Sequence, residues 1–273
     1  MKLFTFGDSW TEGVGGNFSE EWLYETPIER TNIRHKYSWP TQLSKLLNCE
    51  LKNNGVGGFS NNAIFNSICE QLKNKVITQN DFVVVMWSSS LRDDLPFFPT
   101  ENNFHLLGNR YKNKLHLLTY IFDRIGSEHI EYKRAEKNFR DFYINNLYDD
   151  TYYNIVNQNY IIHLQFMFNQ LGIRYLFCDA FDIMVSKNIN ELINKTHLIN
   201  TNRYWGFGDK TMADLLIETK RNDIWDDGKR WELDVAGKHP NKNGYGLIAE
   251  ELYTYILNND ILVKTPIIQS YLL

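Results

Sequence analysis

The sequence predicts an α/β fold in which a mostly parallel sheet lies between two layers of helices. Two continuous apolar runs, residues 82–87 and 173–178, are typical of strands that are buried on both faces of a parallel sheet. Segments with apolar residues at helical spacing alternate with such strands along the chain. The expected architecture is therefore a three-layer α/β/α sandwich.

Two further strands complete the expected sheet. Residues 2–6 alternate in polarity, are rich in β-forming residues, and run into the turn signal of residues 7–10. Residues 49–53 form a shorter strand, which ends at the glycine-rich residues 54–58.

Four segments are expected to be helices because their apolar residues recur on one face. They are residues 38–48, 61–76, 153–171 and 243–258. Ser38 is a suitable N-cap for the first of them, and Gly172 is a suitable end for the third.

We expect residues 1–273 to form a single domain, because neither repeats nor a low-complexity linker divide the chain. Two stretches, at about 95–150 and 186–232, fit the alternation of strands and helices poorly. We interpret both as insertions at the edge of the sheet where ligands bind.

The charge balance excludes two classes of partner. Lys and Arg number 29 and Asp and Glu number 33, which gives a formal net charge of −4. Binding to nucleic acid or to a membrane surface needs clustered positive charge, so we expect neither. The longest apolar run, residues 82–87, is also too short to cross a bilayer.

The cysteines and histidines give no sign of a metal site. Cys49, Cys69 and Cys178 lack metal-ligand spacing and fit inert thiols in a reducing compartment. We expect no metal and no organic cofactor.

The N-terminus shows no secretory pattern, so we expect a cytoplasmic protein. Asparagine is frequent, as in proteins from AT-rich genomes such as those of some phages, so a place in a virus particle is the alternative.

Gly7-Asp8-Ser9 stands where the first expected strand ends. A serine at a tight strand-to-helix turn exposes its hydroxyl and its backbone N–H, which suits a nucleophile and an oxyanion donor. The alternative is an ordinary turn in which Ser9 caps a helix. The motif alone leaves both interpretations open.

Two more motifs follow expected strands. The glycines of residues 54–58 (Asn-Gly-Val-Gly-Gly) allow the backbone to approach a ligand and to point N–H groups at it. A dinucleotide-binding loop is the alternative, but Ser60 stands where its third glycine would be. Residues 88–90 (Ser-Ser-Ser) are either hydrogen-bond donors at the site or a polar loop.

His239-Pro240-Asn241 lies just before the last expected helix. A histidine in a rigid loop at such a junction is a candidate general base, and the alternative is a structural or solvated side chain. The carboxyl ends of parallel strands share one edge of a sheet. We therefore expect these four motifs to converge there.

With these motifs in this order, the sequence resembles the SGNH (GDSL-like) hydrolase family. Residues 7–9 match the family's first block, residues 54–58 look like the second, and residues 239–241 look like the fifth. The resemblance implies a flavodoxin-like form of the sandwich. It also implies that Ser9 is the nucleophile, that His239 is the base, and that the N–H groups of Ser9 and Gly58 bind the oxyanion.

Two positions depart from the family pattern. The third-block Asn, an oxyanion donor in the family, is Ser90 here, whose hydroxyl can donate the same hydrogen bond but reaches less far. The family Asp three residues before the His is Ala236 here, and the nearest acid is Asp234. Either Asp234 orients His239, or a backbone carbonyl does so and catalysis depends on a Ser–His dyad.

The expected function is that of a serine esterase acting on a small-molecule or glycan ester. Aromatic residues make up 15% of the chain and can stack on sugar rings, so we favour an O-acetyl group on a carbohydrate. The candidate substrate-binding residues are Asp8, Trp10, Trp87 and Arg92. Two alternatives stay open: an acyltransferase that uses the same residues, and a binding or structural protein without catalysis. The oligomeric state is not predicted.

Overall fold

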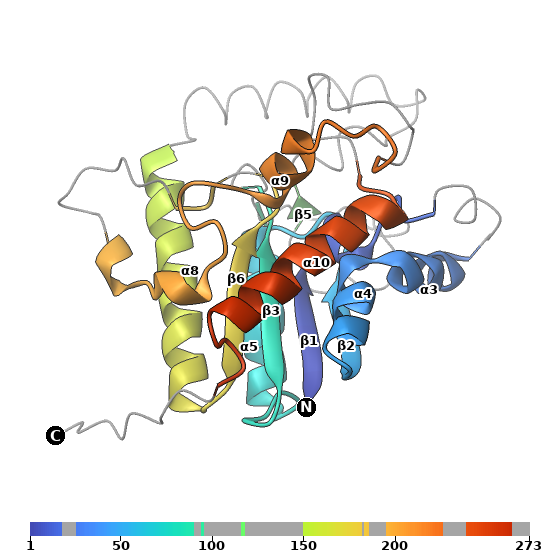
Figure 1. Cartoon of the computed structure of the whole chain (residues 1–273). Coiled ribbons are helices and arrows are strands. Elements are labelled where there is room, and N and C mark those ends of the chain that lie inside the picture. The colour runs from blue at the N-terminus through green and yellow to red at the C-terminus, as the bar shows by residue number, and fades with distance from the viewer. Residues whose placement is uncertain are drawn as a thin grey trace, which may run out of the picture.

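The computed structural model of the 273-residue chain describes eight stretches of it, shown as ribbon in Figure 1. They are residues 1–17, 26–89, 94–95, 116–117, 150–181, 183–185, 195–225 and 239–263. Most of the first expected insertion and two parts of the second, 186–194 and 226–232, lie outside the described residues.

Four parallel strands form the central sheet. Their order is β2 (Glu50–Gly55), β1 (Lys2–Gly7), β3 (Phe82–Trp87) and β6 (Arg174–Asp179). All four coincide with the predicted strands to within two residues, so the predicted parallel sheet is confirmed. The strand order reverses between β1 and β3, and in doubly wound sheets ligands bind at the carboxyl ends of the strands at such a point.

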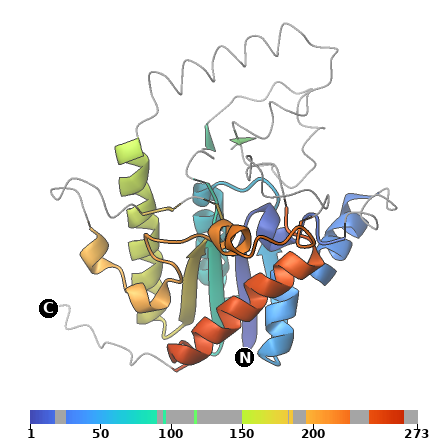
Figure 2. The ribbon, with the colours of Figure 1, turned by 45° about the horizontal axis from the view of Figure 1, so that its top comes forward.

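Helices cover both faces of this sheet, as Figures 1 and 2 show. One layer contains α4 (Trp39–Leu46), α9 (Met212–Glu218) and α10 (Lys242–Asn258), and the other contains α5 (Asn61–Lys73) and α8 (Asp150–Gln170). Along β3, Val84 and Met86 pack against the first layer, whereas Val83 and Val85 pack against the second. Every position of β3 is therefore apolar, and the predicted three-layer α/β/α sandwich is confirmed. No described helix is both long and apolar enough to cross a membrane.

Several short elements were not predicted. They are α1 (Ser9–Glu12), α3 (Pro27–Tyr37), α9, the 3₁₀ helices η3 (Thr196–Leu198) and η4 (Thr201–Arg203), and an antiparallel pair, β4 (Asp94–Leu95) and β5 (His116–Leu117). Capping boxes begin α3 at Thr26 and α9 at Thr211, and this signal was present in the sequence.

The chain between η4 and residue 225 buries Tyr204, Trp205 and Trp225. The described part of the second expected insertion therefore contributes side chains to the core.

Gly7 ends β1 at a point where a side chain has no room. A Cβ there would overlap Thr11 Oγ1 and would lie 2.8 Å from the Met86 carbonyl oxygen. Because α1 and β3 crowd this position, any residue larger than glycine would force one of them to shift.

We expect Gly7→Ala to lower the free energy of unfolding by about 1–3 kcal/mol, measured by urea denaturation, because the added methyl group overpacks the turn. Gly246→Ala is the matched control on α10, since a Cβ there would meet only the Gln42 side chain, at 3.1 Å. The control should change the free energy by less than about 1 kcal/mol. Equal losses in the two variants would contradict the steric explanation.

Candidate active site

Ser9 is the first residue of α1, directly after the turn that ends β1. The Asp8 carboxylate caps this helix, because Oδ1 accepts the Trp10 N–H at 3.0 Å. Asp8 Oδ2 accepts a second hydrogen bond, 2.8 Å long, from the Ser88 hydroxyl at the end of β3. Asp8 therefore ties the two strands on either side of the switch point together and fixes the turn that carries Ser9.

His239 reaches Ser9 from the other end of the chain. Its Nε2 lies 3.0 Å from Ser9 Oγ, although the two residues are 230 positions apart. In the neutral tautomer with the proton on Nδ1, Nε2 accepts the hydrogen bond from the Ser9 hydroxyl. This is the distance and arrangement that a hydroxyl nucleophile and its general base require.

Asn241 fixes the backbone that carries His239. Its side-chain amide donates to the carbonyl oxygens of Asp223 and Trp225, at 2.8 and 2.9 Å. Its backbone N–H donates to the Ile224 carbonyl at 2.8 Å. These three hydrogen bonds therefore hold the loop that carries His239 against residues 223–225.

The first turn of α10 is joined to the chain that follows Ser9. Lys242 N–H donates to the Gly16 carbonyl at 2.9 Å, and the Tyr245 hydroxyl donates to the Val14 carbonyl at 2.6 Å. Because these bonds connect the two segments that carry Ser9 and His239, they also limit how far the two side chains can separate.

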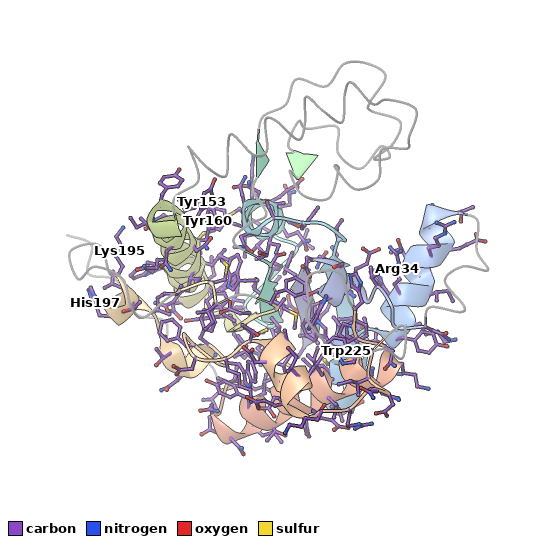
Figure 3. All side chains as sticks on the ribbon, turned by 90° about the horizontal axis from the view of Figure 1, so that it is seen from above. Arg34, Tyr153, Tyr160, Lys195, His197 and Trp225 are labelled. Carbon is purple, nitrogen blue, oxygen red and sulfur yellow. The ribbon has the colours of Figure 1, made fainter. Side chains whose placement is uncertain are left out.

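An aromatic cluster packs beside the junction between α1 and the start of α10. The Trp10 ring meets Phe181 edge to face at a centroid distance of 4.8 Å and meets Trp225 at 6.4 Å. Trp225 also forms a backbone bridge with Pro240, and Figure 3 shows it beside the start of α10. The same aromatic rings therefore pack on α1 and beside the loop that carries His239.

The glycine-rich loop after β2 lies against α1. Phe59 N–H donates to the Val56 carbonyl at 3.1 Å, which closes a turn of four residues. Gly58, the third residue of this turn, has a φ of 85°. A type II turn requires positive φ there, which glycine adopts at little cost. A Cβ on Gly57 would lie 3.8 Å from the Ser9 Cβ, so this turn adjoins Ser9. Within the described chain, neither Gly58 N–H nor Ser9 N–H has an acceptor.

Asn61 holds the third motif in place. Its Oδ1 accepts the Ser88 N–H at 2.8 Å, and its Nδ2 donates to the carbonyls of Ser88 and Ser89 at 3.2 and 3.4 Å. Asn61 is 4% exposed, and it sets the direction in which the chain leaves β3. Sequence reasoning missed this residue, because its partners Ser88 and Ser89 lie 27 and 28 positions away along the chain.

Three predicted site residues lie outside the described part of the chain. They are Ser90, Arg92 and Asp234, so the third oxyanion donor, the anion-binding arginine and the acid of the triad stay predictions.

Three of the four candidate substrate-binding residues have another role. Asp8, Trp10 and Trp87 are each 0% exposed. Trp10 and Trp87 belong to the cores on the two faces of the sheet, and Asp8 is occupied by Trp10 and Ser88. A fully buried side chain offers no surface to a ligand. We therefore assign these three residues to the support of the site and no longer to substrate binding.

The described residues contain no group of three or more His, Cys, Asp or Glu side chains that could hold a metal ion. All three cysteines are free thiols. Burial raises the pKa of each thiol, and most strongly that of the fully buried Cys178, where the neighbouring Asp179 charge adds to the effect. Since the thiolate is the reactive form, these cysteines are poor nucleophiles.

The chain has a distant structural similarity to a G-D-S-L protein. A solved structure described as "Structure of a putative lipolytic protein of G-D-S-L family from Desulfitobacterium hafniense DCB-2" is 12% identical, with a TM-score of 0.37. The alignment covers 93% of this chain and 98% of that one. No family model and no curated protein matches the sequence. At this TM-score we base the function on the geometry of Ser9 and His239 alone.

We expect Asn241→Ala to slow the modification of Ser9 by a fluorophosphonate by about ten- to a hundredfold, because a small displacement of His239 breaks its contact with Ser9. Asn241 is also the N-cap of α10, where its side chain accepts the Asn243 and Gly244 N–H groups, so its loss should lower the free energy of unfolding by about 0.5–2 kcal/mol. Thr211→Ala removes the cap of α9 at a similar cost in stability, and it should react like the wild type. Equal reaction rates for the two variants would show that Asn241 does not position His239.

Proposed function

We propose that the protein is a serine hydrolase that cleaves an ester. The observation that supports this function is the 3.0 Å contact between Ser9 Oγ and His239 Nε2, at the carboxyl edge of the sheet and beside a glycine turn. A hydroxyl paired with an imidazole can attack an acyl carbon, and the same imidazole can then protonate the leaving group.

In the first half of the proposed reaction, Ser9 Oγ attacks the ester carbonyl while His239 Nε2 takes the hydroxyl proton. The carbonyl oxygen becomes an oxyanion, which accepts hydrogen bonds from the N–H groups of Ser9 and Gly58. The tetrahedral intermediate collapses, His239 gives its proton to the departing alkoxide, and an alcohol and an acyl-Ser9 ester result. Water then attacks this ester with His239 as base, which releases the acid and restores Ser9.

Ser90 and Asp234 complete this proposal. The Ser90 hydroxyl would be the third oxyanion donor, and one such donor is worth about 10²–10³ in kcat. Asp234 would accept a hydrogen bond from the His239 Nδ1–H and hold the ring in the tautomer that the reaction needs. If a backbone carbonyl takes that place instead, the chemistry is unchanged in type and slower.

Ser9→Ala should remove both labelling by a fluorophosphonate and turnover of chromogenic esters, because no other described group can take over the attack. His239→Ala should lower kcat by at least about 10⁴-fold. Ser67→Ala on α5, away from the site, is the control and should behave like the wild type. A folded wild-type sample that does not label at Ser9 would refute the proposed function and favour a binding or structural role.

For the substrate, we propose an O-acetylated carbohydrate. The support is the aromatic content of residues 95–150, which the sequence places after the third strand of the predicted sheet. Tyr204, Trp205 and Trp225 do not add to it, because their rings are buried in the core and cannot stack on a sugar.

Acetate release from a panel of acetylated oligosaccharides should exceed release from simple acetate esters of similar reactivity by at least about tenfold in kcat/KM, equal to about 1.4 kcal/mol of binding used in the transition state. The panel is repeated with an added sugar acceptor. Faster ester consumption together with an acylated acceptor would identify an acyltransferase. No preference for any glycan ester would refute the carbohydrate proposal and leave the esterase intact.

A further inference from the structure

Glu12 is a buried carboxylate at the end of α1, three residues after the nucleophile. It is 4% exposed. Its Oε2 accepts the Gly57 N–H at 2.5 Å, and its Oε1 accepts a hydrogen bond from Arg34 Nη1 at 3.1 Å, with Thr31 Oγ1 at 3.5 Å. The carboxylate thus bridges the glycine turn on one side and α3 on the other. Figure 3 shows Arg34 on α3 at this edge of the molecule.

The turn that Glu12 holds is poorly fixed by its own sequence. Gly57 and Gly58 occupy its two central positions, and neither has a Cβ that would favour one orientation of the peptide between them. A shift of the turn relative to α1 would move the Gly58 N–H relative to Ser9 without breaking the hydrogen bond between Phe59 and Val56. The bond from the Gly57 N–H to Glu12 holds the preceding peptide against α1 and so opposes this shift.

The backbone also lies unusually close to α1 at this point. A Cβ on Gly55 would overlap the backbone nitrogen of Glu12, and a Cβ on Gly57 would lie 2.9 Å from Glu12 Oε2. Glycine at these positions therefore allows the loop to reach the carboxylate.

We infer that Glu12 is a positioning residue for the oxyanion hole, acting through Gly57 on the N–H of Gly58. This inference rests on the proposed function. It gives the Glu12–Arg34 ion pair a role in positioning, because the hydrogen bond from the Gly57 N–H connects the pair to the glycine turn.

The position needs a carboxylate, because both of its sides face donors. The Gly57 N–H lies on one side, and the Arg34 guanidinium lies on the other. A carboxylate accepts at both oxygens, whereas an amide accepts at one end and donates at the other. Glutamine at position 12 would direct its oxygen to the charged Arg34, and its NH₂ would then face the Gly57 N–H.

The test is Glu12→Gln, measured by steady-state ester hydrolysis and by the rate of fluorophosphonate labelling. We expect kcat and the labelling rate to fall by about ten- to a hundredfold with KM within about twofold, because the oxyanion forms only in the transition state. Glu250→Gln, an exposed change on α10, is the control and should match the wild type. Circular dichroism and the melting temperature verify that each variant is folded at the assay temperature.

A second variant separates positioning from a general loss of structure. Arg34→Met removes the donor that competes for the amide oxygen, so in the Glu12→Gln/Arg34→Met double variant that oxygen can accept the Gly57 N–H. We expect the double variant to be at least about threefold faster than Glu12→Gln alone, a coupling that independent sites would not give. If Glu12→Gln does not fold, the double variant, which lacks the buried Arg34 cation that the carboxylate no longer neutralises, carries the test and should retain kcat within about tenfold of the wild type.

The outcomes separate the two proposals. A wild type that neither labels nor turns over overturns the esterase and this inference with it. A wild type that is active beside an equally active Glu12→Gln overturns the inference alone. A double variant that is as slow as Glu12→Gln or slower also overturns it, because the loss then does not come from the unpaired Gly57 N–H.

Discussion

The contact between Ser9 and His239 depends on closing a loop of 230 residues, and neither side chain could maintain it unaided. A single neutral hydrogen bond contributes only about 0.5–1.5 kcal/mol net, which is far less than the entropy lost in bringing such distant groups together. The rest of the fold must therefore supply the proximity. It does so through bonds that join the chain after Ser9 to the start of α10, from Lys242 to Gly16 and from Tyr245 to Val14.

The same edge of the sheet is held by buried polar groups that connect the end of one strand to another element. Asp8 joins β1 to β3. Asp179, at the end of β6, accepts the Tyr204 hydroxyl at 2.6 Å and the Met184 N–H at 3.1 Å. Burial, and then the Asp179 charge, raise the pKa of Tyr204 well above its usual range, so the phenol remains a donor. Because a buried donor or acceptor without its partner is costly, each of these pairs favours one arrangement of the loops.

Structural features that depend only on neighbouring residues could be predicted from the sequence. The roles of side chains that depend on tertiary burial could not. The apolar run of β3 and the order of the motifs were enough to place Ser9 and His239 at one edge. Trp10 was expected to face a substrate, because a tryptophan beside a candidate nucleophile has no local feature that shows its burial. Glu12 was missed for the same reason, since its partners Arg34 and Gly57 come from distant segments.

Two carboxylates lie within three residues of Ser9, where the proposed reaction develops negative charge on the substrate carbonyl oxygen, and this arrangement needs compensation. A bare anion at close range in a buried site would destabilise an oxyanion, because the interaction of like charges is strong where water is excluded. Asp8 directs its two oxygens to the Trp10 N–H and the Ser88 hydroxyl, and Glu12 directs its oxygens to Gly57 and to the positive charge of Arg34. The dipoles of these donors and the Arg34 cation oppose the carboxylate fields at Ser9. The two acids can therefore fix the geometry of the site while much of their charge is offset where the oxyanion would form.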